Sequence, residues 1–169
     1  MGETTQFIVR KMKTEDAKEA AAVCKKCFGK HGAPRRKFLE DAAWSWRHRF
    51  FVAEVDGKIA ACAGARVAEF YEDYYEAEKK NAYVEIVAVD PNYHGRGIGT
   101  ELFTKLIDTL ADIGVKSVYL NVHPANTPAI EFYKRFGFKY MSLPEEYPEQ
   151  AAMYLMVERQ WTRNSPSEQ

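Results

Sequence analysis

The chain has 169 residues, of which 46% are hydrophobic and 14% aromatic, a composition typical of folded globular proteins. Its 24 lysine and arginine residues balance its 24 aspartate and glutamate residues, so no excess positive charge favours nucleic acid as a partner. No apolar run has the length that spans a membrane, and the first residues lack an apolar signal-peptide core. We therefore expect a cytoplasmic protein without nucleic-acid or membrane partners, folded as one domain over residues 1–161 and followed by a polar tail at 162–169.

The first part of the chain contains the patterns of two helices and three strands. The expected elements are a strand at 7–10, helices at 15–28 and 34–47, and strands at 50–55 and 58–67. Thr14 is a residue type that caps helices, and it stands directly before the first of them. Asp56-Gly57 favours the positive φ angles of a type I′ turn, so the two strands around it are expected to form a hairpin.

The three cysteines are expected to have packing roles only. Cys24 and Cys27 form a C-x-x-C pattern, but they lie in the first expected helix, with no second pair and no histidine pair nearby. Cys62 lies in a strand of small residues. Buried or half-buried thiols are common in such positions, and no metal site is expected.

The segment at 69–78, with the sequence EFYEDYYEAE, combines five acidic residues with three tyrosines. Two interpretations are open. The segment is a solvated connector between strands, with or without a short amphipathic helix, or it forms an acidic and aromatic wall for a cationic amine.

The segment at 83–110 contains a strand, a glycine-rich turn and a helix in direct succession. Residues 83–89 are mostly apolar, and Asp90-Pro91-Asn92 ends this strand because proline cannot continue a ladder. Gly114 is expected to end the helix. The helix has one apolar face, formed by Leu102, Phe103, Leu106, Ile107 and Leu110.

The glycine-rich turn is a candidate anion site. Gly95, Gly97 and Gly99 let the backbone approach a phosphate closely, and the start of the helix offers unpaired N–H groups with partial positive charge. The turn lacks the lysine and serine or threonine of a P-loop, and Thr100 stands where a dinucleotide-binding fingerprint needs glycine. An ordinary tight turn between strand and helix is the alternative on this stretch alone.

The last third of the chain contains three further strand patterns and one helix. The expected elements are a strand at 116–122, a helix at 129–136 and strands at 138–141 and 151–158. Asn126 or Thr127 is expected to cap the helix, with Pro128 in its first turn and Gly137 at its end.

Two motifs resemble those of the GNAT superfamily of acyl-CoA-dependent N-acyltransferases. The family's pyrophosphate loop, Q/R-x-x-G-x-G/A, falls on His94, Gly97 and Gly99, with histidine in place of the usual glutamine or arginine. The second motif, N-x-x-A-x-x-x-Y-x-x-x-G-F, matches Asn126, Ala129, Tyr133, Gly137 and Phe138. Two motifs in the family's order are much more specific than either motif alone.

The resemblance implies an α/β (mixed α+β) GNAT fold, a mixed and mostly antiparallel sheet of about seven strands with helices on both faces. It implies acetyl-CoA as co-substrate, and no metal. In the family, a splay between the strands at 83–89 and 116–122 receives the pantetheine arm, and an N–H of the first strand polarises the acyl carbonyl. The residues that the resemblance assigns to the cofactor are Val87, Ala88, Val89, His94, Gly95, Arg96, Gly97, Ile98, Gly99, Thr100, Asn126 and Tyr133.

Tyr133 and Glu85 are the catalytic candidates. A phenol with a pKa near ~10 can protonate a departing thiolate near ~8.5, and a core aromatic bonded to a backbone carbonyl is the alternative for Tyr133. Glu85 is an acid in the middle of an apolar strand, which suits a general base with a raised pKa. A structural pair with lysine or arginine is the alternative for Glu85. Asn126 is expected near the cofactor arm or as a helix cap only.

The resemblance implies transfer of an acetyl group to a primary amine by direct attack in a ternary complex. The acceptor is open between a small amine and a protein N-terminus or lysine, and a catalytically silent acyl-CoA-binding module is the alternative to an enzyme. The expected partner is therefore a small-molecule or peptide amine acceptor, and a homodimer is compatible with the family.

Overall fold

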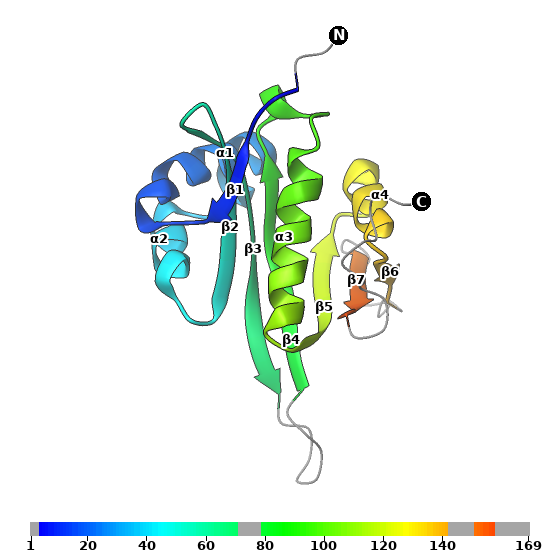
Figure 1. Ribbon diagram of the computed structural model, residues 1–169. Helices are drawn as coiled ribbons and strands as arrows, with labels where there is room; N and C mark the ends of the chain where they lie inside the picture. Colours follow the sequence, from blue (N-terminus) through cyan, green and yellow to red (C-terminus); the bar gives the residue numbers. More distant parts are fainter. Residues whose placement is uncertain (1–3, 71–78, 142–150, 158–169) are drawn as a thin grey trace. The chain divides into compact units, whose positions relative to one another are not determined.

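The computed structural model describes residues 4–70, 79–141 and 151–157, which form the elements labelled in Figure 1. The helices are α1 (Ala17–Gly32), α2 (Arg36–Trp44), α3 (Ile98–Asp112) and α4 (Thr127–Arg135), with short 3-10 turns at Thr14–Asp16 and Pro91–Tyr93. The strands are β1 (Ile8–Lys11), β2 (His48–Val55), β3 (Lys58–Phe70), β4 (Lys79–Val89), β5 (Val115–Val122), β6 (Lys139–Tyr140) and β7 (Ala151–Met156).

The seven strands form one sheet in the order β1-β2-β3-β4-β5-β7-β6. β1 with β2, β2 with β3, β5 with β7 and β6 with β7 are antiparallel pairs, whereas β4 with β5 is parallel. This sheet confirms the mixed, mostly antiparallel architecture that the sequence predicted. The chain divides into two compact units, Met1–Arg66 with Glu85–Leu110 and Val67–Val84 with Ala111–Gln169.

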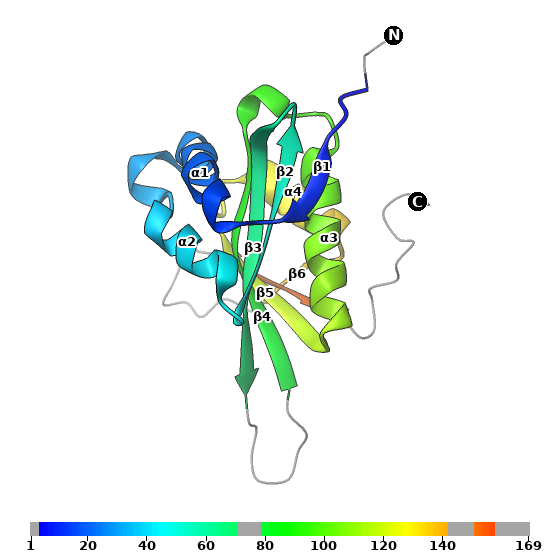
Figure 2. The same cartoon turned by 60° about the vertical axis from the view of Figure 1, so that its left-hand side comes forward.

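The first unit has helices on both faces of its strands. α1 and α2 lie on one side of β2 and β3, and α3 lies on the other (Figure 2). Phe50 and Val52 of β2 pack with Leu39 of α2 and Val23 of α1 in one buried cluster. The predicted apolar face of α3 is fully buried, at Leu102, Phe103, Leu106, Ile107 and Leu110.

The start of α1 differs from the prediction, because Thr14 does not cap it. Thr14 opens a 3-10 turn, and the α-helix begins at Ala17. The carboxylate of Asp16 instead accepts the Lys13 backbone N–H at 2.7 Å and both terminal nitrogens of Arg10, at 2.7 and 2.8 Å. A carboxylate that satisfies a backbone donor and an arginine together displaces the weaker threonine cap.

The end of α2 also differs from the prediction, which extended this helix to 47. The backbone N–H of Ser45 makes the last helical hydrogen bond, to Asp41, and Ser45 itself is extended with ψ 131°. His48 already pairs with Arg66 across β2 and β3. Sheet pairing, which is not local, therefore ends this helix three residues early.

The hairpin of β2 and β3 is confirmed by its turn geometry. Asp56 and Gly57 have φ of 49° and 77°, as a type I′ turn requires. Further along the hairpin, Gly64 is paired with Phe50. A Cβ placed on Gly64 would lie 2.4 Å from atoms of the Phe50 ring, so the glycine lets the ring lie flat across β3.

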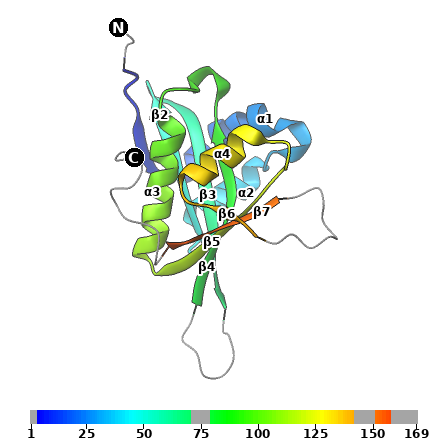
Figure 3. The same cartoon turned by 90° about the vertical axis from the view of Figure 1, so that its right-hand side faces the viewer.

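The second unit places β7 between β5 and β6, with α4 following β5 (Figure 3). The predicted strands at 116–122, 138–141 and 151–158 are confirmed with small changes in their ends. The predicted loop at 143–148 and the tail at 162–169 lie outside the described residues. So do residues 71–78 of the acidic segment, whose first two residues, Glu69 and Phe70, end β3. None of the described helices is both long and apolar enough to cross a bilayer.

Candidate functional site

The glycine-rich turn joins β4 to the first turn of α3, as the sequence predicted. Gly95 and Gly97 have φ of 75° and 77°, which is left-handed backbone that other residues rarely adopt. A Cβ on either glycine would meet no atom within 4 Å, so the space beside this backbone is open. Gly99 and Thr100 lie within the first turn of α3, where helix geometry leaves the N–H groups unpaired. This open backbone at a helix N-terminus fits a phosphate-bearing ligand.

His94 holds the turn to the end of β4. Its Nε2 atom donates to the carbonyl oxygen of Val89 at 2.9 Å, which places the ring proton on Nε2. The same carbonyl accepts the Cys27 thiol at 3.2 Å, from α1. Sequence reasoning gave Cys27 no such role, because the pairing depends on how α1 packs against the sheet. His94 therefore has a structural contact of its own, whatever it contributes to a ligand.

Arg96 points away from the turn toward the N-terminal segment. Its guanidinium donates to Thr5 Oγ1 at 3.0 Å and to the Asn92 carbonyl at 3.3 Å, and it lies over the Tyr93 ring at 5.2 Å. These groups line a polar hollow of about 490 Å³ together with Val55 and Asp56. The expected contact of Arg96 with a cofactor remains a prediction.

Asp90, directly before the turn, is a buried carboxylate with two partners. It is 5% exposed, and it accepts Lys26 Nζ at 2.7 Å and the Asn92 backbone N–H at 3.0 Å. Burial opposes ionisation, but these hydrogen bonds outweigh it and hold the pKa of Asp90 below its ordinary value. The charged carboxylate thus fixes the end of β4 to α1.

The parallel ladder between β4 and β5 is short. Over the described residues it runs from Lys80, opposite Val115, to Tyr83, opposite Tyr119. Just past the last pair, Asn121 Nδ2 donates to the Tyr83 hydroxyl at 2.9 Å. Residues 87–89, the expected donors to an acyl carbonyl, lie beyond the end of this ladder on β4.

Glu85 lies in the first unit between two basic side chains. Its Oε1 atom is 3.5 Å from Arg66 Nε, and its Oε2 atom is 3.6 Å from His48 Nε2. Oε2 is fully covered and has no hydrogen-bond partner among the described residues. Burial raises the pKa of Glu85, and the positive charge of Arg66 opposes part of that rise. Arg66 is the arginine that the structural alternative requires, and the role of Glu85 as a general base remains a prediction.

Asn126 caps α4, which is one of its two expected roles. Its side-chain oxygen accepts the Ala129 backbone N–H at 3.3 Å, and Pro128 occupies the first turn. The amide is exposed, so a ligand contact as well remains a prediction for this residue.

Tyr133 lies on α4 among aromatic side chains of the second unit. Its ring meets Phe132 at 5.5 Å and Phe138 at 5.7 Å between centroids. Burial raises the pKa of Tyr133 to about 12, so the phenol stays protonated across the physiological range. A phenol in this state can donate a proton or a hydrogen bond, and it is a poor base.

No group of three or more histidine, cysteine, aspartate or glutamate side chains within 4–70, 79–141 and 151–157 could hold a metal ion. Cys24 and Cys62 are buried in the first unit, and all three cysteines are free.

Comparisons with known proteins agree with the two motifs. The acetyltransferase (GNAT) family matches residues 17–138. An N-alpha-acetyltransferase of Sulfurisphaera tokodaii is 33% identical over 101 residues, which cover 58% of this chain and 60% of that relative.

Solved structures share the fold over nearly the whole chain. The ribosomal-protein-S18-alanine N-acetyltransferase of Escherichia coli superposes with a TM-score of 0.68 at 25% identity, covering 90% of this chain and 94% of the other. Arabidopsis thaliana NAA60 in complex with acetyl-CoA gives 0.75 at 18% identity, over 90% and 99% of the two chains. With a family match over most of its length, the chain belongs to the acetyltransferase (GNAT) family.

Proposed function

We propose that this protein is an acetyl-CoA-dependent N-acetyltransferase. The observation that carries the proposal is the backbone at Gly95 and Gly97, left-handed and open on the side that a Cβ would occupy, at the start of α3. Such a turn binds a pyrophosphate through N–H groups and the helix dipole. Membership of the GNAT family supports coenzyme A as the source of that pyrophosphate.

We propose the α-amine of a polypeptide as the acceptor, ahead of small amines and lysine side chains. The support is that two of the related proteins are an N-alpha-acetyltransferase and a ribosomal-protein alanine N-acetyltransferase. The matched region covers 60% of the first of these.

Each catalytic candidate has one role in this proposal. Acetyl-CoA supplies an acyl group activated as a thioester. Glu85 accepts the first proton that the ammonium loses, and the neutral nitrogen then forms the C–N bond as the C–S bond breaks. Tyr133 gives its proton to the leaving sulfur. The nitrogen then loses its second proton to solvent, and solvent returns a proton to the Tyr133 oxygen. An N–H within residues 87–89 stabilises the charge that develops on the carbonyl oxygen.

The test is acetyl-CoA-dependent thiol release with matched acceptors, after subtraction of the signal from protein alone. One peptide has a free N-terminus and an acetylated lysine, and its partner has an acetylated N-terminus and a free lysine. Polyamines, amino sugars and amino acids complete the panel, and mass spectrometry locates the added acetyl group.

We expect turnover with the free α-amine only. Turnover confined to the free lysine or to a small amine would overturn the acceptor class and keep the enzyme. Binding of acetyl-CoA by calorimetry without any turnover would favour a silent binding module, and absence of binding would overturn the whole proposal.

A further inference from the structure

Three side chains from neighbouring strands of the first unit converge at Glu85. His48 opens β2, Arg66 is its register partner on β3, and Glu85 lies on β4. Arg66 is 54% exposed, whereas His48 and Glu85 are 16% and 19% exposed. The carboxylate is therefore oriented, with Oε2 turned inward toward the imidazole and Oε1 toward the exposed guanidinium.

The covered Oε2 atom lacks a hydrogen-bond partner among the described residues, which is costly for a carboxylate. The group that can relieve this cost is His48 Nε2, 3.6 Å away. A proton on either atom would make one the donor and the other the acceptor, since both can take either role. One proton between Glu85 and His48 thus satisfies both groups.

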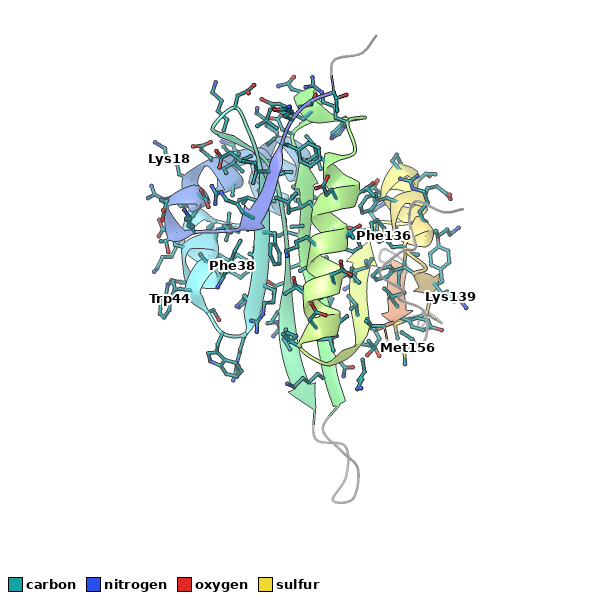
Figure 4. All side chains as sticks on the ribbon, viewed as in Figure 1. Lys18, Phe38, Trp44, Phe136, Lys139 and Met156 are labelled. Atoms are coloured by element: carbon teal, nitrogen blue, oxygen red, sulfur yellow. The ribbon has the colours of Figure 1, made fainter. Side chains whose placement is uncertain are left out.

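The imidazole is held so that Nε2 faces Glu85. Its Nδ1 atom lies 3.0 Å from Ser45 Oγ, in the turn between α2 and β2. Phe38 meets the ring edge-on at 5.8 Å, and Phe50 lies 5.9 Å away. Figure 4 labels Phe38 on the inner side of α2, facing β2. The ring can neither turn nor withdraw without losing these contacts.

We propose that His48 is a positioning residue that shares one proton with Glu85, and so sets the pH at which Glu85 can accept a proton from the acceptor amine. The inference rests on the proposed function, in which Glu85 is the base. It adds a second titrating group, from a different strand, that the sequence gave no reason to select.

Burial supports the pairing, because it acts on the two groups in opposite directions. It raises the pKa of Glu85 and lowers that of His48. The charges facing the pair are Arg66, which favours the carboxylate and disfavours the imidazolium, and Arg47, which disfavours the imidazolium. Two groups whose atoms lie 3.6 Å apart, and whose pKa values burial brings together, are expected to titrate as one pair.

The pair makes a prediction that does not depend on turnover. For two coupled groups, the Glu85 carboxyl carbon titrates in two steps, one below and one above the single step that it shows in His48→Gln. The steps should lie at least about 1 unit apart, because an opposite charge at this distance shifts a pKa by about 1 to 3 units. By reciprocity, the His48 ring should titrate in two steps that lie on either side of its single step in Glu85→Gln.

The experiment follows carbon-13 shifts of the carboxyl groups and imidazole rings with pH in the full chain, with Glu85→Gln assigning the carboxyl signal. His31→Gln, a matched change of an exposed histidine near the end of α1, should leave the Glu85 titration unaltered. If His48→Gln is unstable, the titration of His48 in wild type and in Glu85→Gln gives the same coupling. A single Glu85 step, at the same pH in wild type and His48→Gln, would overturn the inference.

The second test of the inference is the pH dependence of activity. The acidic limb of kcat/KM against pH, at saturating acetyl-CoA, should move upward by about 1 unit in His48→Gln. Acetyl-CoA affinity by calorimetry should be unchanged, which a general loss of structure would not allow. An unmoved limb would contradict the inference, whereas failure of wild type to bind acetyl-CoA would contradict the proposed function and leave the titration result standing.

Discussion

Tyr133 has the protonation state that the proposed general acid requires. Its ring is packed between Phe132 and Phe138, and burial raises its pKa to about 12. A departing thiolate has a conjugate pKa of about 8.5, so transfer from this phenol is uphill by several units unless it is concerted with bond breaking. In the proposed mechanism, Tyr133 therefore transfers its proton to sulfur in concert with the breaking of the C–S bond.

Replacement of Tyr133 by phenylalanine should therefore lower kcat by about 10²-fold, the lower end of the range for a general acid. Acetyl-CoA affinity should stay within about twofold, because the ring packing is retained. Phe132→Leu, which alters the same aromatic cluster without removing a hydroxyl, is the matched control. Stopped-flow or steady-state rates at saturating substrate measure the effect, and full activity in Tyr133→Phe would show that the hydroxyl is dispensable.

The two family motifs selected Tyr133, Asn126 and the glycines, because each of these residues belongs to a local pattern. Gly95 and Gly97 lie in the turn that the sequence predicted, both with positive φ, and Asn126 caps α4. His48 and Arg66 belong to no local pattern. Their place beside Glu85 follows from the pairing of β2 with β3 and the position of β4, which the order of residues does not reveal.

The elements to which we assign cofactor binding are β4, the glycine turn and α3, which follow one another directly in the chain. Their sequence pattern was sufficient for prediction because strand, turn and helix signals follow one another without a gap. The contacts that join this segment to α1 could not be predicted from the sequence. Lys26 with Asp90 and Cys27 with Val89 each join residues more than sixty positions apart, at 2.7 and 3.2 Å.

Gly97→Leu should reduce acetyl-CoA affinity at least tenfold, because its side chain would fill the open space beside the turn. Left-handed backbone at a residue with a Cβ also costs about 1–2 kcal/mol of stability. Gly57→Leu is the matched control, since Gly57 has the same φ of 77° and equally open surroundings in the β2–β3 turn. Calorimetry on both variants separates the two effects, and equal affinity in Gly97→Leu and wild type would refute the anion site.

At the scale of the whole molecule, the fold class and the mixed, mostly antiparallel sheet were predictable from the two family motifs, whereas the order of the strands was not predicted. The residues at which helices begin and end were less predictable. α2 stops before the predicted limit because β2 pairing begins at His48, and α1 starts late because Asp16 serves Arg10 and Lys13. In both cases a contact with another strand overrides a local propensity.

The Arg10 cluster makes the stability of the fold depend on pH. Arg10 bridges Asp16 and Glu54, and its hydrogen bonds to Asp16 lower the pKa of that carboxyl against the opposing effect of burial. A depressed carboxyl pKa stabilises the folded state above its ordinary value of 3.8, and this stabilisation disappears as pH falls through the folded-state value.

Asp16→Asn should therefore lower the free energy of unfolding by about 1–2 kcal/mol at pH 7, and the difference from wild type should shrink below pH 3.8. Urea titrations at pH 7, 5 and 3 measure it. Asp41→Asn, which removes an exposed pair with Lys37, should change the free energy of unfolding much less than Asp16→Asn does. A difference that is the same at every pH would show that Asp16 acts through packing and not through its charge.

Phe50 and Gly64 restrict one another in a way that extends beyond this single sequence. The ring of Phe50 occupies the place where a side chain at 64 would begin, so any larger residue at 64 requires a smaller one at 50. Among homologous chains the two positions should consequently vary together, with an aromatic residue opposite glycine or a small residue opposite a larger one. The two positions therefore report the register of β2 with β3. Evolution can replace both residues together, but a substitution at one position alone is disfavoured.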